Sequence, residues 1–203
     1  TSKITPRRNV TVARGSGVSS NLDILVLVDE QAESRRVGGL RQIAFTEKLA
    51  ALPQETVNSV PLNACEQFLD GYTWGTMRLA DITPGPKSAT SHPLQIIGDP
   101  SSGIVPGACS DNGTLDAENT PADLGTNGII GVASFLQDCG TACAQKAVAA
   151  TYYACPSGGQ CQGTAVPVPM QAQNVVANFA QDNNGVVLGL PAISAAGQGV
   201  TGG

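Results

Sequence analysis

The segment from Cys65 to Ile82 constrains the fold most, because it combines turn-forming pairs, the only tryptophan and a strand pattern. Asp70-Gly71 and Trp74-Gly75 are turn-forming pairs, and residues 76–82 alternate polar and apolar side chains, as a half-buried strand does. The segment therefore predicts a β-hairpin with an aromatic tip, followed by a strand that ends at residues 84–86.

The aromatic residues of this hairpin, Tyr72 and Trp74, have two possible roles. They cover either the protein's own core or a ligand cleft. From this segment alone the core is favoured, because an exposed tryptophan is costly without a partner.

The composition limits the class of protein. A chain of 203 residues makes one large domain or two small ones. Charged residues are 13% of the chain, about half the usual share, and 24 Gly with 13 Pro indicate many turns, as in loop-rich β proteins. A net charge of −5 does not favour nucleic acid as a partner. No apolar run approaches the length of about 18 residues that a membrane span needs.

Six cysteines allow every thiol to be paired, in 15 possible connectivities. We expect the disulfides Cys65–Cys109, Cys139–Cys143 and Cys155–Cys161. Zinc is the competing interpretation, but zinc sites usually have Cys-x-x-Cys pairs or nearby histidines, and His92 is the only histidine. We therefore expect no metal and no cofactor, and we expect a secreted or periplasmic protein, since disulfides persist in oxidising compartments.

Two further segments carry the functional hypotheses. Residues 24–28 form a continuous apolar run that ends at Asp29 and predict a buried strand with a carboxylate at its end. That aspartate is either an active-site residue or a turn or helix cap. In residues 127–132, Asn-Gly predicts a turn, Ile129 and Ile130 enter the core, and Gly131 permits close approach of another backbone. We expect residues 1–21 to be a flexible polar leader and residues 22–203 to be one domain.

In their order, these segments resemble the N-terminal lobe of pepsin-like aspartic proteases. In that fold a hydrophobic strand presents Asp-Thr-Gly, an aromatic β-hairpin flap closes over the cleft, and a later hydrophobic-hydrophobic-Gly segment packs under the active-site loop. The resemblance implies a mostly β barrel lobe with short helices and disulfide-stapled loops. It also implies a catalytic position at Asp29, a flap formed by Phe68, Tyr72 and Trp74, and a supporting segment formed by Gly128, Ile129, Ile130 and Gly131.

A closer resemblance covers about residues 39–200. Gly-Tyr-Thr-Trp-Gly at 71–75, Gln-Asp-Cys-Gly at 137–140, Tyr-Tyr-Ala-Cys-Pro at 152–156 and Asp-Asn-Asn-Gly at 182–185 resemble an uncharacterised family of secreted bacterial proteins that is remotely related to the aspartic proteases. Members resemble Val-Asp-Thr-Gly-Ser-Ser-Gly-Leu-Arg at the active-site loop. This chain departs from that pattern, because residues 30–38 stand between Val28-Asp29 and Gly39-Leu40-Arg41.

The departure bears on activity. Aspartic proteolysis needs two carboxylates that share one proton, and each lobe or subunit supplies one of them. The ten aspartates include no Asp-Thr-Gly or Asp-Ser-Gly. We therefore expect an aspartic-protease-like domain that lacks its second lobe and is not catalytic alone. Any catalysis on a polypeptide would need that lobe or a homodimer that pairs Asp29 with its copy.

Three alternatives remain. The first is a non-catalytic module that binds a peptide or a carbohydrate with the hairpin aromatics, and the second is a disulfide-stapled fragment without a function of its own. The third is a catalytic site built on His92, but a lone histidine is more often a surface or structural residue. Asp-Asn-Gly at 111–113 and Asp-Asn-Asn-Gly at 182–185 hint at calcium loops, but loop turns explain them better because the EF-hand spacing is absent. Burial of Trp74 is the criterion for the flap: a fully buried Trp74 excludes it.

Overall fold

The computed structural model describes residues 8–13, 19–28, 41–44, 49–84, 86–124, 127–132 and 136–183. The described part of the chain is mostly β with a few short helices, as predicted. The strands are β1 (Arg8–Ala13), β2 (Ser19–Val28), β3 (Arg41–Ala44), β4 (Thr56–Val57), β5 (Val60–Gln67), β6 (Gly71–Pro84), β7 (Ala89–Ile97), β8 (Asp116–Ala117), β9 (Gly128–Val132), β10 (Tyr152–Ala154) and β11 (Gln162–Gly163). The helices are α1 (Pro121–Leu124), α2 (Thr141–Gln145) and the 3-10 helices η1 (Leu49–Ala51), η2 (Pro100–Ser102), η3 (Asp111–Gly113), η4 (Val168–Met170) and η5 (Val175–Asn178).

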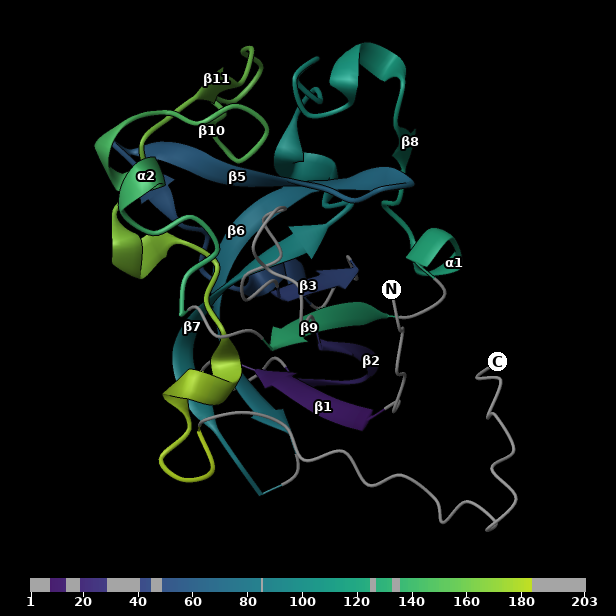
Figure 1. Cartoon of the computed structure of the whole chain (residues 1–203), viewed down its shortest axis with the longest axis vertical. Helices are drawn as coiled ribbons and strands as arrows, with labels where there is room; N and C mark the ends of the chain where they lie inside the picture. The colour runs from purple at the N-terminus through teal and green to yellow at the C-terminus, as the bar shows by residue number, and fades with distance from the viewer. Residues whose placement is uncertain are drawn as a thin grey trace, which may run out of the picture.

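Six strands form a closed ring in the order β1-β2-β9-β3-β7-β6, because β6 also pairs with β1. Neighbours in this ring are antiparallel, except for the parallel pairs β2–β9 and β3–β7. Ring closure removes the free sheet edges that an open sheet would expose. Figure 1 shows β1, β2, β9 and β3 stacked below β5, with β6 and β7 curving between the two levels.

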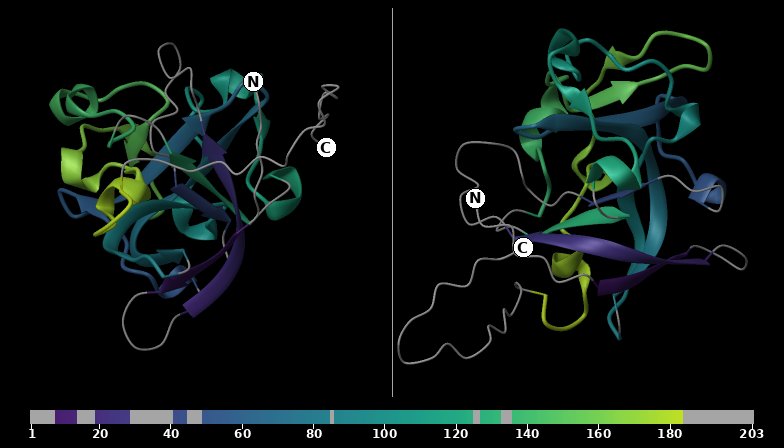
Figure 2. Two further views of the ribbon diagram at one scale, coloured as in Figure 1. Left: turned by 60° about the horizontal axis from the view of Figure 1, so that its bottom comes forward. Right: turned by 90° about the vertical axis from the view of Figure 1, so that its right-hand side faces the viewer.

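The long strand β6 connects the two levels, as the right-hand view of Figure 2 also shows. Side chains alternate along a strand, so its even-numbered residues share one face. At one end of that face Ala80 and Ile82 belong to the barrel cluster, and at the other end Tyr72 and Trp74 belong to the disulfide cluster. Met77, on the opposite face, belongs to the outer cluster.

These three names refer to groups of buried residues. The barrel cluster contains Leu49, Leu52, Ala80, Ile82, Ala89, Leu94, Ile96, Ile130, Val175 and Phe179. The disulfide cluster contains Cys65, Tyr72, Trp74, Cys109, Tyr153 and Cys155. The outer cluster contains Leu62, Ala64, Met77, Cys143, Tyr152, Val166 and Ala172.

Beyond β6 the sheet continues through β5, β10 and β11, where the disulfides lie. The structure contains Cys65–Cys109, Cys139–Cys143 and Cys155–Cys161, which are the pairs preferred from the sequence. Cys65–Cys109 attaches the long loop after β7 to β5. Two of the three disulfides therefore contribute sulfur atoms to the disulfide cluster, and Cys139–Cys143 contributes to the outer cluster.

Two expectations about local structure are wrong. Residues 8–13 of the expected leader form β1, which pairs with both β2 and β6, and β2 already begins at Ser19. Trp74-Gly75 is not a turn but lies inside β6. Gly75 is needed there because a Cβ atom would lie 1.8 Å from the carbonyl oxygen of Ile96 on the neighbouring β7. Glycine thus permits close strand approach rather than chain reversal.

The strand after the hairpin is also more buried than its alternating pattern predicted. The hairpin itself forms, with Asp70-Gly71 at its turn and a hydrogen bond of 2.8 Å from the Phe68 N–H to the Gly71 carbonyl. Residues 71–78 of β6, however, are buried without exception. Polar positions on this strand are buried because both of its faces are covered by hydrophobic clusters and loops.

Candidate functional site

The strand β9 lies between β2 and β3 and is the first element of the candidate site. It runs parallel to β2, with Val28 opposite Val132, and antiparallel to β3, with Arg41 opposite Ile130. The chain leaves β2 at Val28 and returns to the sheet at Arg41, on the other side of β9. Parallel strands end at the same edge of a sheet, so the carboxyl ends of β2 and β9 are neighbours.

The predicted supporting segment is thus adjacent to the strand that leads to Asp29. Gly131 lies opposite Leu27 in the β2–β9 register, two positions before Asp29. Ile129 and Ile130 are buried, and Ile130 belongs to the barrel cluster. Asp29 itself and the departure at residues 30–38 lie outside the described residues.

Trp74 is a core residue, since only 2% of its surface is exposed. It lies opposite Cys65 on β5, and its ring meets that of Tyr153 edge-on, with 5.5 Å between the ring centroids. The indole N–H donates a hydrogen bond of 3.3 Å to the carbonyl oxygen of Gly103. The expected flap role of Trp74 is therefore wrong, because a fully buried ring cannot lie over a ligand cleft.

Tyr72 is buried beside Trp74 in the disulfide cluster, so its flap role is wrong too. Phe68 lies half-buried at the turn, next to Leu69, which is 83% exposed. The physical reason is the loop attached by Cys65–Cys109, which covers the aromatic residues. A module that stacks a sugar or holds a peptide on Tyr72 and Trp74 consequently loses its binding surface.

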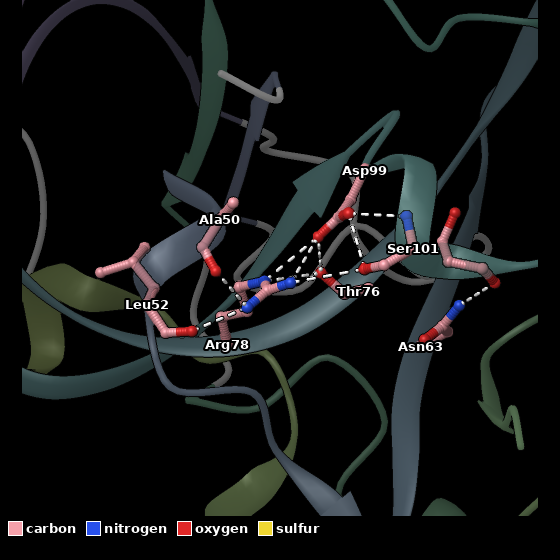
Figure 3. Close-up of polar contacts among 8 residues, drawn as sticks. Ala50, Leu52, Asn63, Thr76, Arg78, Asp99 and Ser101 are labelled. Carbon is pink, nitrogen blue, oxygen red and sulfur yellow. Dashed lines mark hydrogen bonds and ion pairs between the residues drawn. The ribbon is translucent and has the colours of Figure 1, made fainter. Parts of the chain in front are cut away.

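A buried ion pair between Arg78 and Asp99 was not anticipated from the sequence (Figure 3). Arg78 Nη2 lies 2.8 Å from Asp99 Oδ2, and Arg78 Nε donates to the same oxygen at 3.1 Å and to Thr76 Oγ1 at 3.0 Å. Arg78 Nη1 donates to the carbonyl oxygens of Ala50, at 3.0 Å, and Leu52, at 2.7 Å. The guanidinium therefore joins η1, β6 and the start of η2.

The Asp99 carboxylate also accepts several hydrogen bonds. Its Oδ2 accepts from Thr76 Oγ1 at 2.7 Å, and its Oδ1 accepts from the Ser101 N–H at 2.9 Å and the Ser101 hydroxyl at 2.7 Å. Burial raises the pKa of Asp99, but the hydrogen bonds from Thr76, Ser101 and Arg78 outweigh burial and hold this pKa below its ordinary value. A carboxylate held in this way is a structural anchor rather than a proton donor or acceptor for a substrate.

His92 is also structural. Its Nδ1 lies 3.1 Å from Asn178 Nδ2 and its Nε2 lies 3.3 Å from the Gln173 carbonyl oxygen, so Nδ1 accepts and Nε2–H donates. These contacts attach the segment around η5 to β7. His92 is buried, which agrees with the structural interpretation of the lone histidine and not with a catalytic one.

Among the described residues, no group of three or more His, Cys, Asp or Glu side chains could hold a metal ion. Asp111–Gly113 forms η3, an exposed turn in which Asn112 has φ 56°. No helix in the described ranges has the length and apolarity needed to cross a membrane.

Comparison with known proteins gives one match. Residues 23–203 match the model of a family described as "Protein of unknown function (DUF3443)". No curated protein and no solved structure matches the chain.

Proposed function

We propose a function for this chain, a member of the DUF3443 family, from its strand topology. It is a domain related to the aspartic proteases that does not catalyse alone, and Asp29 marks the position of its single catalytic carboxylate. The observation that carries this proposal is the placement of β9 between β2 and β3. A support segment of the hydrophobic-hydrophobic-Gly type must lie close to the strand that bears the aspartate. In β9 this segment is paired with β2, the strand that leads to Asp29.

The chemistry explains why one copy is not enough. Two carboxylates about 3 Å apart must share a proton, so that one activates water while the other protonates the scissile carbonyl oxygen. One chain contributes only Asp29 to such a pair. The second carboxylate comes from a further lobe or from Asp29 of a second copy, and the substrate class is an unfolded polypeptide.

The three disulfides fit a protein of an oxidising compartment, and we place this domain outside the cell or in the periplasm. The location is a separate part of the proposal from the proteolytic chemistry.

Hydrolysis of an unfolded protein between about pH 3 and 6 tests the proposal, because a carboxylate dyad holds one proton in that range. The chain is separated by size, and monomer and dimer fractions are assayed beside Asp29→Asn, with the exposed Asp70→Asn as the matched control. We expect cleavage only from dimer fractions or covalently linked dimers, lost in Asp29→Asn and retained in Asp70→Asn. Cleavage by the monomer, or cleavage that Asp29→Asn leaves unchanged, would contradict the proposal, and a linked dimer that cleaves nothing would exclude Asp29 of a second copy as the source of the second carboxylate.

A further inference from the structure

Glu55 is a buried carboxylic acid that the proposed chemistry does not use. It lies one residue before β4, is 7% exposed, and its Oε2 atom has no hydrogen-bond partner. Its backbone is fixed on both sides: the N–H donates to the Met77 carbonyl and the carbonyl accepts from the Leu62 N–H, each at 2.9 Å. The backbone of Glu55 is thus held between β6 and β5 while its side chain carries an unsatisfied polar atom.

The strand register shows what surrounds this side chain. Gln54 pairs with Arg78 on β6, so Glu55 lies opposite Met77 and on the same face of the sheet. Met77 and Leu62 both belong to the outer cluster. An ionised carboxylate is costly in apolar surroundings, and burial raises the pKa of Glu55 to about 8.

Charged groups on the neighbouring elements do not offset this cost. On β6, Arg78 points to the opposite face, toward Asp99. On β5, Glu66 shares the face of Glu55 but has the same sign of charge. Across the outer cluster, Asp138 is also acidic, and its Oδ2 accepts a hydrogen bond of 2.6 Å from Tyr152. Lys146, at the end of α2, is exposed. A compensating cation is therefore not available from these elements.

We propose that Glu55 is a pH-sensitive switch for the segment from Pro53 to Val57. When the carboxyl group is protonated, this segment stays paired with β6 and β5; when it ionises, the segment opens and exposes the carboxylate to water. The opening is bounded on one side by Leu52, whose carbonyl binds Arg78, and on the other by the turn at Asn58 and Ser59, which both have positive φ. The rest of the sheet remains paired.

The pKa difference of Glu55 between the closed and open states determines how the open fraction changes with pH. The exposed carboxyl group of the open state titrates near its ordinary pKa of 4.5, whereas the closed state titrates near 8. The closed state therefore binds more protons between these values, and the open fraction rises about tenfold per pH unit. Above about pH 8 both states are ionised and the open fraction levels off.

Hydrogen exchange of three amides reports the opening directly. The opening would break the hydrogen bonds that the N–H groups of Glu55, Leu62 and Leu79 donate. Their protection factors, corrected for the intrinsic pH dependence of exchange, are measured from pH 5 to 9. We expect protection to fall about tenfold per unit up to pH 8 and then to become constant.

Two substitutions at Glu55 and one elsewhere make the test decisive. Glu55→Gln and Glu55→Met remove the ionisable group, and whichever folds should show protection independent of pH. Glu66→Gln, on the same face of β5, should keep the wild-type pH dependence. The proposal is wrong if protection falls with pH equally in the wild type and in a folded Glu55 variant, or if Glu66→Gln abolishes the fall.

Discussion

The two ends of β6 are stabilised in different ways. At the Ile82 end, six strands close on one another, and the barrel cluster that β6, β7 and β9 help to form contains no cysteine. At the Tyr72 end, β10 and β11 are two or three residues long, the connecting loops are long, and the disulfide cluster contains three half-cystines. Closed strand pairing organises one end, and covalent links organise the other.

The difference shows what a sheet needs when it cannot close. Short strands provide few ladder hydrogen bonds, so long loops must be tied down by other means. Here Cys65–Cys109 brings the loop after β7 onto Trp74, and the indole then hydrogen-bonds that loop at Gly103. The aromatic residues and the disulfide therefore form one structural unit, which predicts unequal effects of substitutions at the two ends.

The largest effect should come from Cys65→Ala with Cys109→Ala. This disulfide closes a loop with a sequence separation of 44, whose entropy corresponds to about 4 kcal/mol of unfolding free energy. Urea denaturation measures the loss, and near-ultraviolet circular dichroism of Trp74 reports whether the disulfide cluster stays packed. Removing Cys139–Cys143, with a separation of 4, should cost about 2 kcal/mol. Equal losses from the two pairs would contradict the loop-closure explanation.

The second effect concerns the ion pair of Arg78, which lies on β6 between the two ends, with Asp99, which caps the start of η2. Asp99→Asn leaves a buried guanidinium without its counter-ion, and we expect a loss of about 3 kcal/mol in the free energy of unfolding. Lys87 and Asp182 form an exposed ion pair that serves as the control, and Asp182→Asn should cost less than about 0.5 kcal/mol. Similar losses in both variants would show that burial is not what gives the Arg78 pair its importance.

The Arg78–Asp99 pair should also make the free energy of unfolding depend on pH in the acidic range. The pKa of Asp99 is lowered in the folded state, so its contribution is fully present above the ordinary value of 3.8 and is lost as pH falls through the lower folded value. Urea midpoints of the wild type should therefore fall below about pH 4 more steeply than those of Asp99→Asn. Parallel curves for the two proteins would exclude this contribution.

A third, smaller effect is expected from Trp74→Phe. The substitution removes the hydrogen bond to Gly103 and part of the edge-on contact with Tyr153, and we expect a loss of about 2 kcal/mol. Urea denaturation measures it with both the disulfides intact and the Cys65–Cys109 pair removed. If Trp74 and that disulfide form one unit, the two losses should not add. Additive losses would show that Trp74 and the Cys65–Cys109 disulfide stabilise the fold independently.

The sequence predicts the strands well where a local pattern decides them. The apolar run before Asp29 lies in β2, Asn127-Gly128 leads into β9, and Asp70-Gly71 turns the hairpin, because each signal is contained in a few residues. Arg78 illustrates the limit. An arginine in an alternating pattern predicts a solvent-facing position, and only long-range packing places Asp99, Ala50 and Leu52 around it.

The candidate site, too, was predicted from the sequence only in part. The resemblance predicts that residues 128–131 pack under the active-site loop, and the structure shows that their strand, β9, pairs with β2, which leads to Asp29. The core position of Trp74, favoured by the hairpin segment alone, is confirmed, and the flap role implied by the resemblance is wrong. A hairpin with aromatic residues looks the same in sequence whether it is open or covered. Cys65, opposite Trp74 in register, was the available signal that a disulfide-linked loop would cover it.

The smallest effect should come from Leu69, at the tip of the same hairpin. Leu69 is 83% exposed, so Leu69→Ser removes little buried surface and should change the free energy of unfolding by less than about 0.5 kcal/mol. Trp74, five residues away, should cost several times more, although both are large apolar side chains of one hairpin. Urea denaturation of the two single variants makes this comparison. A loss at Leu69 equal to that at Trp74 would mean that the tip is buried in solution, and the disulfide-linked loops would then not be what distinguishes the two positions.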